Sequence, residues 1–208
     1  MKARIWMAVI TIAALLSAPF SFAADEKIGI FEVIHASSVS FEETTAAVDA
    51  AFESSGLVLH ATHDVRVPEN KHQARVYVLT SPIYADAAKE ESPRTISAQI
   101  LRIAVFTHGD EQKTYINMLN PVAYAMVFYS LSDNYDAMLA AAGNAADEIR
   151  TLVATVPGEA KSIQQSPMRK EKHYRKYKGD GPARMMAKFR NYYKSQLLID
   201  EDTAEGFD

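Results

Sequence analysis

Histidine is the residue type in this sequence best suited to chemistry near neutral pH, because its ring titrates there and is a frequent metal ligand. His60 and His63 have the spacing of a chelating pair, but an offset of three along a β-strand sends them to opposite faces. His63 and His35 each share a predicted strand face with apolar residues, so we expect these two to line one interior cavity. There they would bind a ligand, or one of them would act as a general base. The alternative is that both are core histidines with hydrogen-bonded rings.

Two further residues are predicted at such a ligand site. Met118 would supply a thioether to Cu(I) or an axial ligand to haem, unless it simply fills the core. Tyr124 belongs to an aromatic set that would wall a pocket for a flat apolar ligand, or would pack a helix onto a sheet. That set is Tyr115, Tyr124, Phe128 and Tyr129.

Other common chemistries have no support in the sequence. The chain has no cysteine, which excludes disulfides, zinc–thiolate and iron–sulfur sites, thiol nucleophiles and lipidated cysteine anchors. It also has no P-loop, dinucleotide fingerprint, nucleophile elbow or metalloprotease histidine pair. Neighbouring carboxylates fall at helix ends and turns, where capping or solvation explains them better than acid–base catalysis. The sequence therefore does not indicate which cofactor the protein would use.

Residues 1–23 have the features of a cleaved secretory signal peptide. Lys2 and Arg4 form a basic start, an apolar run follows, and Ser21-Phe22-Ala23 places small residues before the cleavage site. The apolar run of about 12 residues is shorter than the roughly 20 that a membrane-spanning helix needs. We therefore expect a periplasmic or secreted protein with no transmembrane segment after cleavage.

Residues 24–156 are predicted to form a two-layer α+β domain whose mainly antiparallel, five-stranded sheet carries packed helices. Ser40 and Glu43 make a capping box before the first helix, and Asn120-Pro121 begins another. The strands are expected at 28–35, 57–67, 74–80, 100–107 and 113–119. Helices are expected at 41–55 and 82–91. A third is expected to begin at residue 121, and a longer fourth helix, which includes Tyr135, is expected to end near residue 156.

Residues 157–208 change in character. A polar, proline-containing linker is expected at 157–168, then a basic segment, a helix over 183–198 and an acidic tail. Residues 24–156 carry 9 basic and 18 acidic residues, whereas residues 169–194 carry ten basic and two acidic. The basic arm begins with Arg169, Lys170, Lys172, Arg175, Lys176 and Lys178. Because an exported protein rarely meets nucleic acid, we expect this arm to bind an acidic partner or an anionic envelope surface, or else to pack on its own acidic domain.

Residues from about 36 to 127 resemble the domain of unknown function 302 family. The matching pieces are Ser40-Phe41-Glu42-Glu43-Thr44, Ser55-Gly56-Leu57, Val76 to Pro82, Ile100 to Phe106, Lys113-Thr114-Tyr115 and Asn120-Pro121. The resemblance implies a compact α+β domain, often a homodimer, with no settled activity. Members often carry a Pro-Cys before the fourth strand, but Ile96-Ser97-Ala98-Gln99 has neither residue here, so no thiol role carries over.

These observations favour an exported, non-catalytic protein that binds a small ligand, a metal or haem. The alternatives are an enzyme with His63 or His35 as general base, and a purely structural partner-binding protein.

Overall fold

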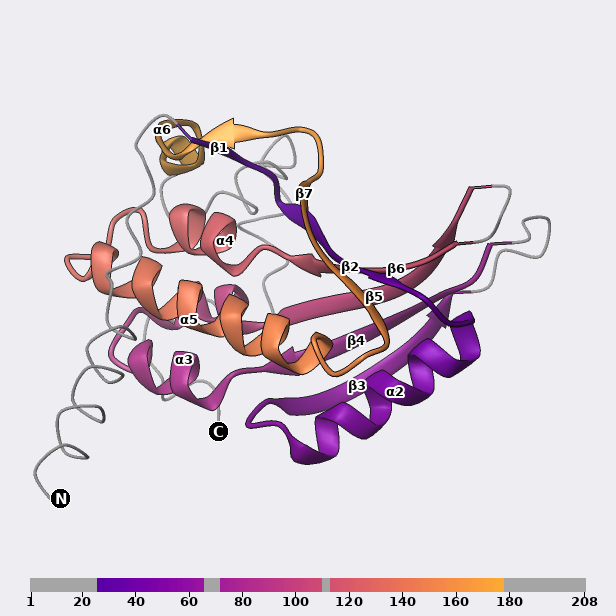
Figure 1. The fold of residues 1–208 in the computed structure, drawn as a ribbon. Helices are drawn as coiled ribbons and strands as arrows, with labels where there is room; N and C mark the ends of the chain where they lie inside the picture. Colours follow the sequence, from indigo (N-terminus) through magenta and orange to yellow (C-terminus); the bar gives the residue numbers. More distant parts are fainter. Residues whose placement is uncertain (1–25, 66–71, 110–112, 178–208) are drawn as a thin grey trace, which may run out of the picture.

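A computed structural model describes residues 26–65, 72–109 and 113–177, and these form a mixed α+β fold built on a large antiparallel sheet (Figure 1). The sheet has six strands in the order β3-β4-β5-β6-β2-β7, one more than the five expected. The strands are β2 (Phe31–Ser37), β3 (Val58–Val65), β4 (Ala74–Thr80), β5 (Leu101–His108), β6 (Lys113–Leu119) and β7 (Gly158–Gln164).

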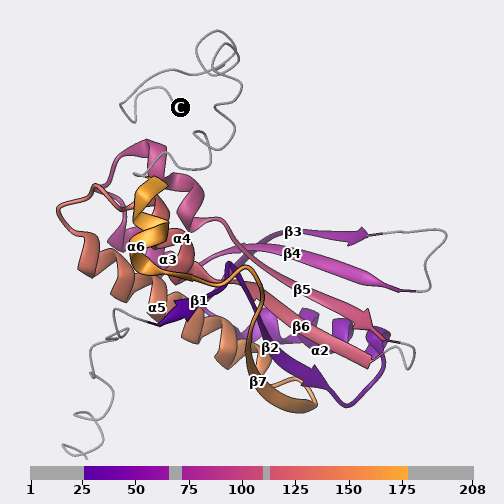
Figure 2. The same ribbon diagram turned by 90° about the horizontal axis from the view of Figure 1, so that it is seen from above.

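The helices gather on one side and at one end of the sheet. The α-helices are α2 (Phe41–Ser54), α3 (Pro82–Ala87), α4 (Pro121–Phe128), α5 (Tyr135–Val153) and α6 (Glu171–Tyr174), and two 3₁₀ helices are η1 (Pro93–Gln99) and η2 (Arg175–Tyr177). Figure 2 shows α2 and α5 on the same side of the sheet, with α3, α4 and α6 grouped at one end. The core lies between this covered face and the helices, where Tyr77, Ile103 and Met118 are fully buried.

Local signals in the sequence explain where several elements begin. The Ser40 hydroxyl accepts a hydrogen bond from the backbone N–H of Glu43, and the Ser40 N–H donates to the Glu43 carboxylate, so the expected capping box is confirmed. Asn120 caps α4, with its side-chain oxygen accepting from the N–H groups of Val122 and Ala123. Strands β5 and β6 pair as the predicted hairpin.

The sixth strand lies in the segment that was expected to be a linker. Residues Gly158–Gln164 form β7, which pairs antiparallel with β2 at the edge of the sheet. The prediction of a linker over 157–168 is therefore wrong. Its sequence, Gly-Glu-Ala-Lys-Ser-Ile-Gln, has little β-branched content, and tertiary pairing with β2 overrides that weak local preference.

The two ends of the described chain meet in a second, small sheet. Strand β1 (Lys27–Ile28) pairs antiparallel with β8 (Arg169–Lys170), and the buried Tyr174 hydroxyl donates to the carbonyl of Ile28 over 2.8 Å. The predicted first strand is thus divided at Gly29, where an added Cβ would lie 2.3 Å from the Gln165 carbonyl oxygen. Only glycine permits that close approach.

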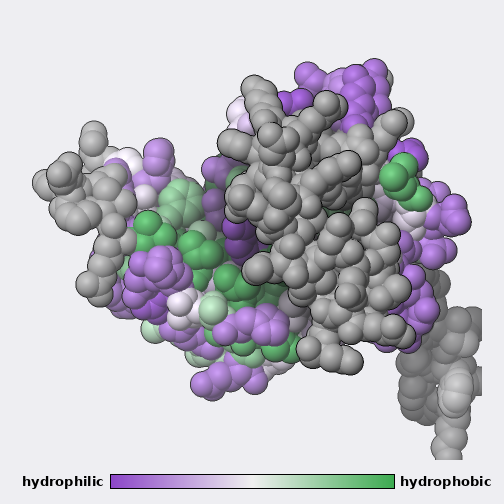
Figure 3. Space-filling model, turned by 180° about the vertical axis from the view of Figure 1, so that it is seen from behind, coloured by the Kyte–Doolittle hydropathy of each residue, from purple (hydrophilic) through white to green (hydrophobic). Residues whose placement is uncertain are grey.

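The other face of the main sheet has no described helix over it (Figure 2). We call it the open face and define it by the side chains of Phe31, Val58, Val65, Val76, Phe106 and Ile163. Figure 3 views the molecule from behind and shows hydrophobic residues gathered on the visible part of this face.

Candidate functional site

His35 is a buried core histidine, with an exposed fraction of 3%. It pairs with Ile116 of β6, whose side chain is in the core, so its ring lies on the helix-covered face. Its Nε2 atom is 3.5 Å from the Pro157 carbonyl oxygen, and an added Cβ at Gly158 would come within 2.5 Å of the same nitrogen. The ring is therefore enclosed by the start of β7.

His63 lies far from His35 and on the opposite face of the sheet. It is exposed and sits beside Val76 on the edge strand β3, four strand positions from β2, which corresponds to about 19 Å. The expectation that His35 and His63 line one interior cavity is wrong.

A β-bulge explains that error. The register of β3 shifts between Leu59 and Ala61, so Leu59 faces the core-lining Leu79 whereas Ala61 and His63 lie on the open face. The prediction from the sequence assumed strict alternation along the strand, which placed Leu59, Ala61 and His63 on one face. A bulge inserts one extra residue and reverses the faces beyond it.

The other two predicted ligand residues pack in or against the core. Met118 is fully buried on β6, opposite Ile103 and Glu32. Tyr124 is half-buried on α4, where its ring centroid is 5.7 Å from that of Phe128. Neither lies beside His63. Within the described ranges, no group of three or more histidine or acidic side chains is placed to hold a metal ion.

The structure instead shows a cleft between α2 and the neighbouring ends of β3 and β4, which we call the α2 cleft. Its volume is about 480 Å³, within the usual range for small-molecule sites of roughly 300–1,000 Å³. It is lined by Phe41, Glu42, Thr45, Ala46, Asp49, Asp64, Val65, Gln73, Ala74 and Arg75.

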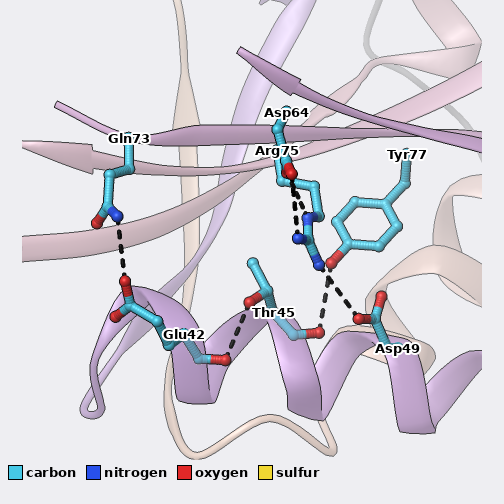
Figure 4. Close-up of polar contacts among 7 residues, drawn as sticks. All are labelled: Glu42, Thr45, Asp49, Asp64, Gln73, Arg75 and Tyr77. Atoms are coloured by element: carbon cyan, nitrogen blue, oxygen red, sulfur yellow. Dashed lines mark hydrogen bonds and ion pairs between the residues drawn. The ribbon is translucent and has the colours of Figure 1, made fainter. Parts of the chain in front are cut away.

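Arg75 is held at the cleft by two carboxylates (Figure 4). Its Nε and Nη2 atoms donate to the two oxygens of Asp64 over 2.6 and 3.3 Å, and Nη1 donates to Asp49 over 3.3 Å. The bond to Asp64 is the main reason that the pKa of Arg75 is raised above its ordinary value. The guanidinium therefore stays charged, and its fork is occupied by protein carboxylates.

Two further contacts connect α2 to β4 and to Gln73, the residue that precedes it. The Gln73 side-chain amide donates to Glu42 over 3.1 Å, and the Tyr77 hydroxyl donates to the Thr45 carbonyl over 3.3 Å. Burial, followed by the charge of Asp49, raises the pKa of the Tyr77 hydroxyl, so it remains protonated at neutral pH. Figure 4 shows these side chains pointing toward one another from the helix and the sheet.

The charge of the α2 cleft favours a cation. Glu42, Asp49 and Asp64 outnumber Arg75 among the lining residues, and Phe41 and Ala46 of α2 add apolar surface. The three carboxylates are each held by a protein donor, Glu42 by Gln73 and both Asp49 and Asp64 by Arg75, which orders them as charged groups. Such a set of side chains suits binding of a small organic cation better than proton transfer.

One pair in the cleft was detectable in the sequence. Asp64 and Arg75 are direct cross-strand neighbours of β3 and β4. Pairing the two predicted strands about the short segment between them would have placed these opposite charges face to face. The contributions of Glu42 and Asp49 depend on how α2 packs, which strand pairing alone does not reveal.

A second hollow lies between the end of α2 and α5. Its volume is about 510 Å³, and its lining includes Ser55, Leu57, Asp147, Glu148 and Thr151. It has acidic residues on one helix only, and Arg150 already pairs with Asp147. The charged residues that line the α2 cleft come from α2, β3 and β4, whereas those that line this second hollow come from α5 alone.

The start of the basic arm packs partly on the domain. Arg175 stacks its guanidinium 4.4 Å from the ring centroid of Tyr135 and pairs with Glu171 at 3.6 Å. Arg169, Lys172 and Lys176 are exposed, and Lys170 is half-buried. Lys178 and the helix expected over 183–198 lie outside the described residues. No described helix has the length and apolar character needed to cross a membrane.

Comparisons with known proteins support the fold. No family model matches the chain, and a search of curated proteins finds no match. Among solved structures, the chain is similar to the crystal structure of the uncharacterized conserved protein DUF302 from Bacillus stearothermophilus. The two are 13% identical with a TM-score of 0.50, over 62% of this chain and 99% of the other. The chain therefore has a DUF302-like fold.

Proposed function

We propose that this chain is an exported, non-catalytic binding protein whose α2 cleft takes a small organic cation, such as an amine with an apolar body. One observation carries the proposal: carboxylates from α2 and β3 surround a cleft of about 480 Å³ in which Arg75 is already fixed by Asp49 and Asp64. A cationic ligand would meet net negative charge there, and its apolar part would contact Phe41.

The general-base alternative has less support. His35 is buried against the Pro157 carbonyl, and His63 lies on the open face, outside the α2 cleft.

The ligand proposal is tested by calorimetric titration with benzylamine, and with benzyl alcohol as a neutral analogue of the same size. We expect benzylamine to bind and benzyl alcohol to bind at least tenfold more weakly. Asp49→Asn and Glu42→Gln should each weaken benzylamine binding several-fold, and high salt should weaken it further. Glu53→Gln is the matched control, because Glu53 is exposed on the same helix and does not line the cleft. Equal binding of the alcohol, or an effect of Glu53→Gln as large as that of Asp49→Asn, would overturn the proposal.

Export is a separate part of the proposal, supported by the signal-like residues 1–23. Expressed in a bacterium, the full chain should appear in the periplasmic fraction with Ala24 as its first residue. N-terminal sequencing of that fraction tests this. A cytoplasmic protein that retains Met1 would contradict it.

The basic arm is proposed to contact an anionic envelope surface or an acidic partner through the exposed Arg169, Lys172 and Lys176. Co-sedimentation with phosphatidylglycerol vesicles should fall as salt rises, and should fall in the triple Gln variant of these residues. Binding that is equal on phosphatidylcholine vesicles would exclude the electrostatic mechanism. The resemblance also implies a homodimer, which light scattering would detect.

A further inference from the structure

The open face carries apolar side chains that the described elements leave uncovered on the main sheet. Four of its side chains are substantially exposed: Phe31 at 40%, Val58 at 44%, Val65 at 39% and Ile163 at 53%. They come from β2, β3 and β7, so the surface extends from one edge of the sheet to the other. His63, Arg102 and Asn117 lie on the same face among these apolar side chains. Several exposed apolar side chains on one sheet face mark a site that another element covers.

The chain itself contains a segment with the right chemistry. Residues 183–198 are expected to be helical, and in such a helix Met186, Phe189, Tyr193 and Leu197 would fall on one face at spacings of three and four. Lys188 would lie on the opposite face. Arg190, four residues after Met186, would flank this apolar stripe, so its aliphatic stem would lie along the protein surface while its charged end reaches water, as in a helix that packs one side onto a protein.

The dimensions agree. A helix of 16 residues is about 24 Å long at 1.5 Å per residue, and six strands spaced at roughly 4.8 Å also span about 24 Å between the outermost two. The apolar stripe itself, from Met186 to Leu197, is about 16 Å long, so it reaches across most of the width of the sheet.

The position of the chain at Tyr177 also agrees. The described residues end in η2, which lies beside α4 at one end of the sheet (Figure 2). From Tyr177 the five residues 178–182 precede the segment, and an extended connection of this length spans at most about 20 Å. That reach is comparable with the width of four strand spacings, and covalent attachment gives the segment a high effective concentration at the sheet.

We propose that residues 183–198 form an amphipathic helix that packs its apolar stripe across the open face of the same chain. The contact is apolar, so it should persist at high salt, in contrast to the electrostatic binding proposed for Arg169, Lys172 and Lys176. The cationic side of the helix would then face outward and extend the basic surface of the arm.

Cross-linking of the full chain tests the contact directly, because the protein has no cysteine of its own. Ala104 lies on β5 next to Val76 and Phe106, so Ala104→Cys introduces a thiol at the centre of the open face. Combined with Met186→Cys and treated with a short bis-maleimide at low protein concentration, it should give an intrachain cross-link that salt does not reduce. The matched control is Ala46→Cys with Met186→Cys, because Ala46 is an exposed alanine of α2, on the covered side of the sheet. It should give much less product.

The two rival outcomes both overturn the proposal. A cross-link that joins two chains and grows with concentration would show that a second copy occupies the open face. Equal intrachain yields from Ala104→Cys and Ala46→Cys would show a segment with no fixed position.

A second measurement does not require the introduced thiols. The double variant Phe189→Asp/Tyr193→Asp should increase binding of a hydrophobic dye at least threefold, because the open face becomes uncovered. Asn191→Asp/Ser195→Asp adds the same charge on the other side of the predicted helix and should leave dye binding unchanged. Equal dye binding by both variants, or strong binding by the unaltered chain, would contradict the intramolecular contact.

Discussion

The Nη2 atom of Arg150 on α5 lies 2.9 Å from the Oε2 atom of Glu32 on β2, and Glu32 is 1% exposed. The other carboxylate oxygen of Glu32 accepts a hydrogen bond from the Ser162 hydroxyl of β7 over 2.9 Å. One buried carboxylate therefore connects a central strand to the long helix and to the edge strand.

Replacing Glu32 should be costly, because a buried carboxylate with two partners is lost and the partners remain. We expect Glu32→Ala to lower the free energy of unfolding by about 2–4 kcal/mol, measured by urea denaturation. Arg150→Met should cost a similar amount, because it leaves the buried Glu32 carboxylate without its charged partner. If the double variant Glu32→Ala/Arg150→Met loses as much stability as the two single variants added together, the two residues are not coupled.

Gly158 should not tolerate a side chain. Its φ is +147°, and an added Cβ would lie 2.3 Å from the Ala36 carbonyl oxygen. Gly158→Ala should therefore destabilise the start of β7 by about 2 kcal/mol or more. Gly56→Ala is the control, because an added Cβ there meets no atom within 4 Å, and it should change stability by less than about 1 kcal/mol. Thermal denaturation of both variants would show the difference, and equal melting temperatures would refute it.

Two buried tyrosines should make the protein sensitive to alkali. Burial raises the pKa of Tyr84 well above its ordinary value of 10.0, with Tyr129 adding to the rise, and burial also raises that of Tyr77. A raised pKa in the folded state means that stability is complete below pH 10 and is lost as the pH rises above it, by up to about 1.4 kcal/mol per pH unit for each group.

The variants Tyr84→Phe and Tyr77→Phe separate this effect from hydrogen bonding. The buried Tyr84 hydroxyl oxygen has no hydrogen-bond partner within the described part of the chain, so Tyr84→Phe should cost little at pH 7 or stabilise slightly. Tyr77→Phe loses the bond to Thr45 and should cost about 1 kcal/mol at pH 7. Both should flatten the loss of stability between pH 10 and 11, as followed by circular dichroism during urea denaturation. An unchanged slope in both variants would contradict the assignment.

Tyr174 should control how firmly the basic arm is attached. Its hydroxyl bonds to the Ile28 carbonyl in a buried setting, so Tyr174→Phe should cost about 1 kcal/mol. Because the loss is local to β1, β8 and α6, amide exchange should accelerate at Ile28 and Arg169 before it changes at Ile103 of β5. Uniform acceleration across the sheet would show that the arm and the main sheet unfold together.

Much of the fold was predictable from local signals. Ser40 with Glu43, Ser81 with Pro82, and Asn120 with Pro121 each mark a helix start through their own hydrogen-bonding chemistry. The hairpin of β5 and β6 was predictable from two short strand patterns around turn residues. These features depend on residues close in sequence.

The features that sequence patterns did not predict depend on tertiary contacts. The bulge at His60 reversed the face on which His63 lies, and no local residue type announces it. Strand β7 exists because β2 offers it a partner. The α2 cleft requires Asp49 of one helix to meet Arg75 of a strand 26 positions away, which periodicity within either element does not specify.

The pairing of β1 with β8 has a mechanical consequence. Lys27 is opposite Lys170 and Ile28 is opposite Arg169, so the chain enters and leaves this pair at the same end. A force that pulls the two ends of the protein apart would therefore open the pair one hydrogen bond at a time, as a zipper, rather than shear all its bonds at once. If the protein is held at both ends, for example by a surface and a partner, these strands would yield at low tension while the six-stranded sheet remains intact. The junction would serve as an extensible tether ahead of the rigid domain.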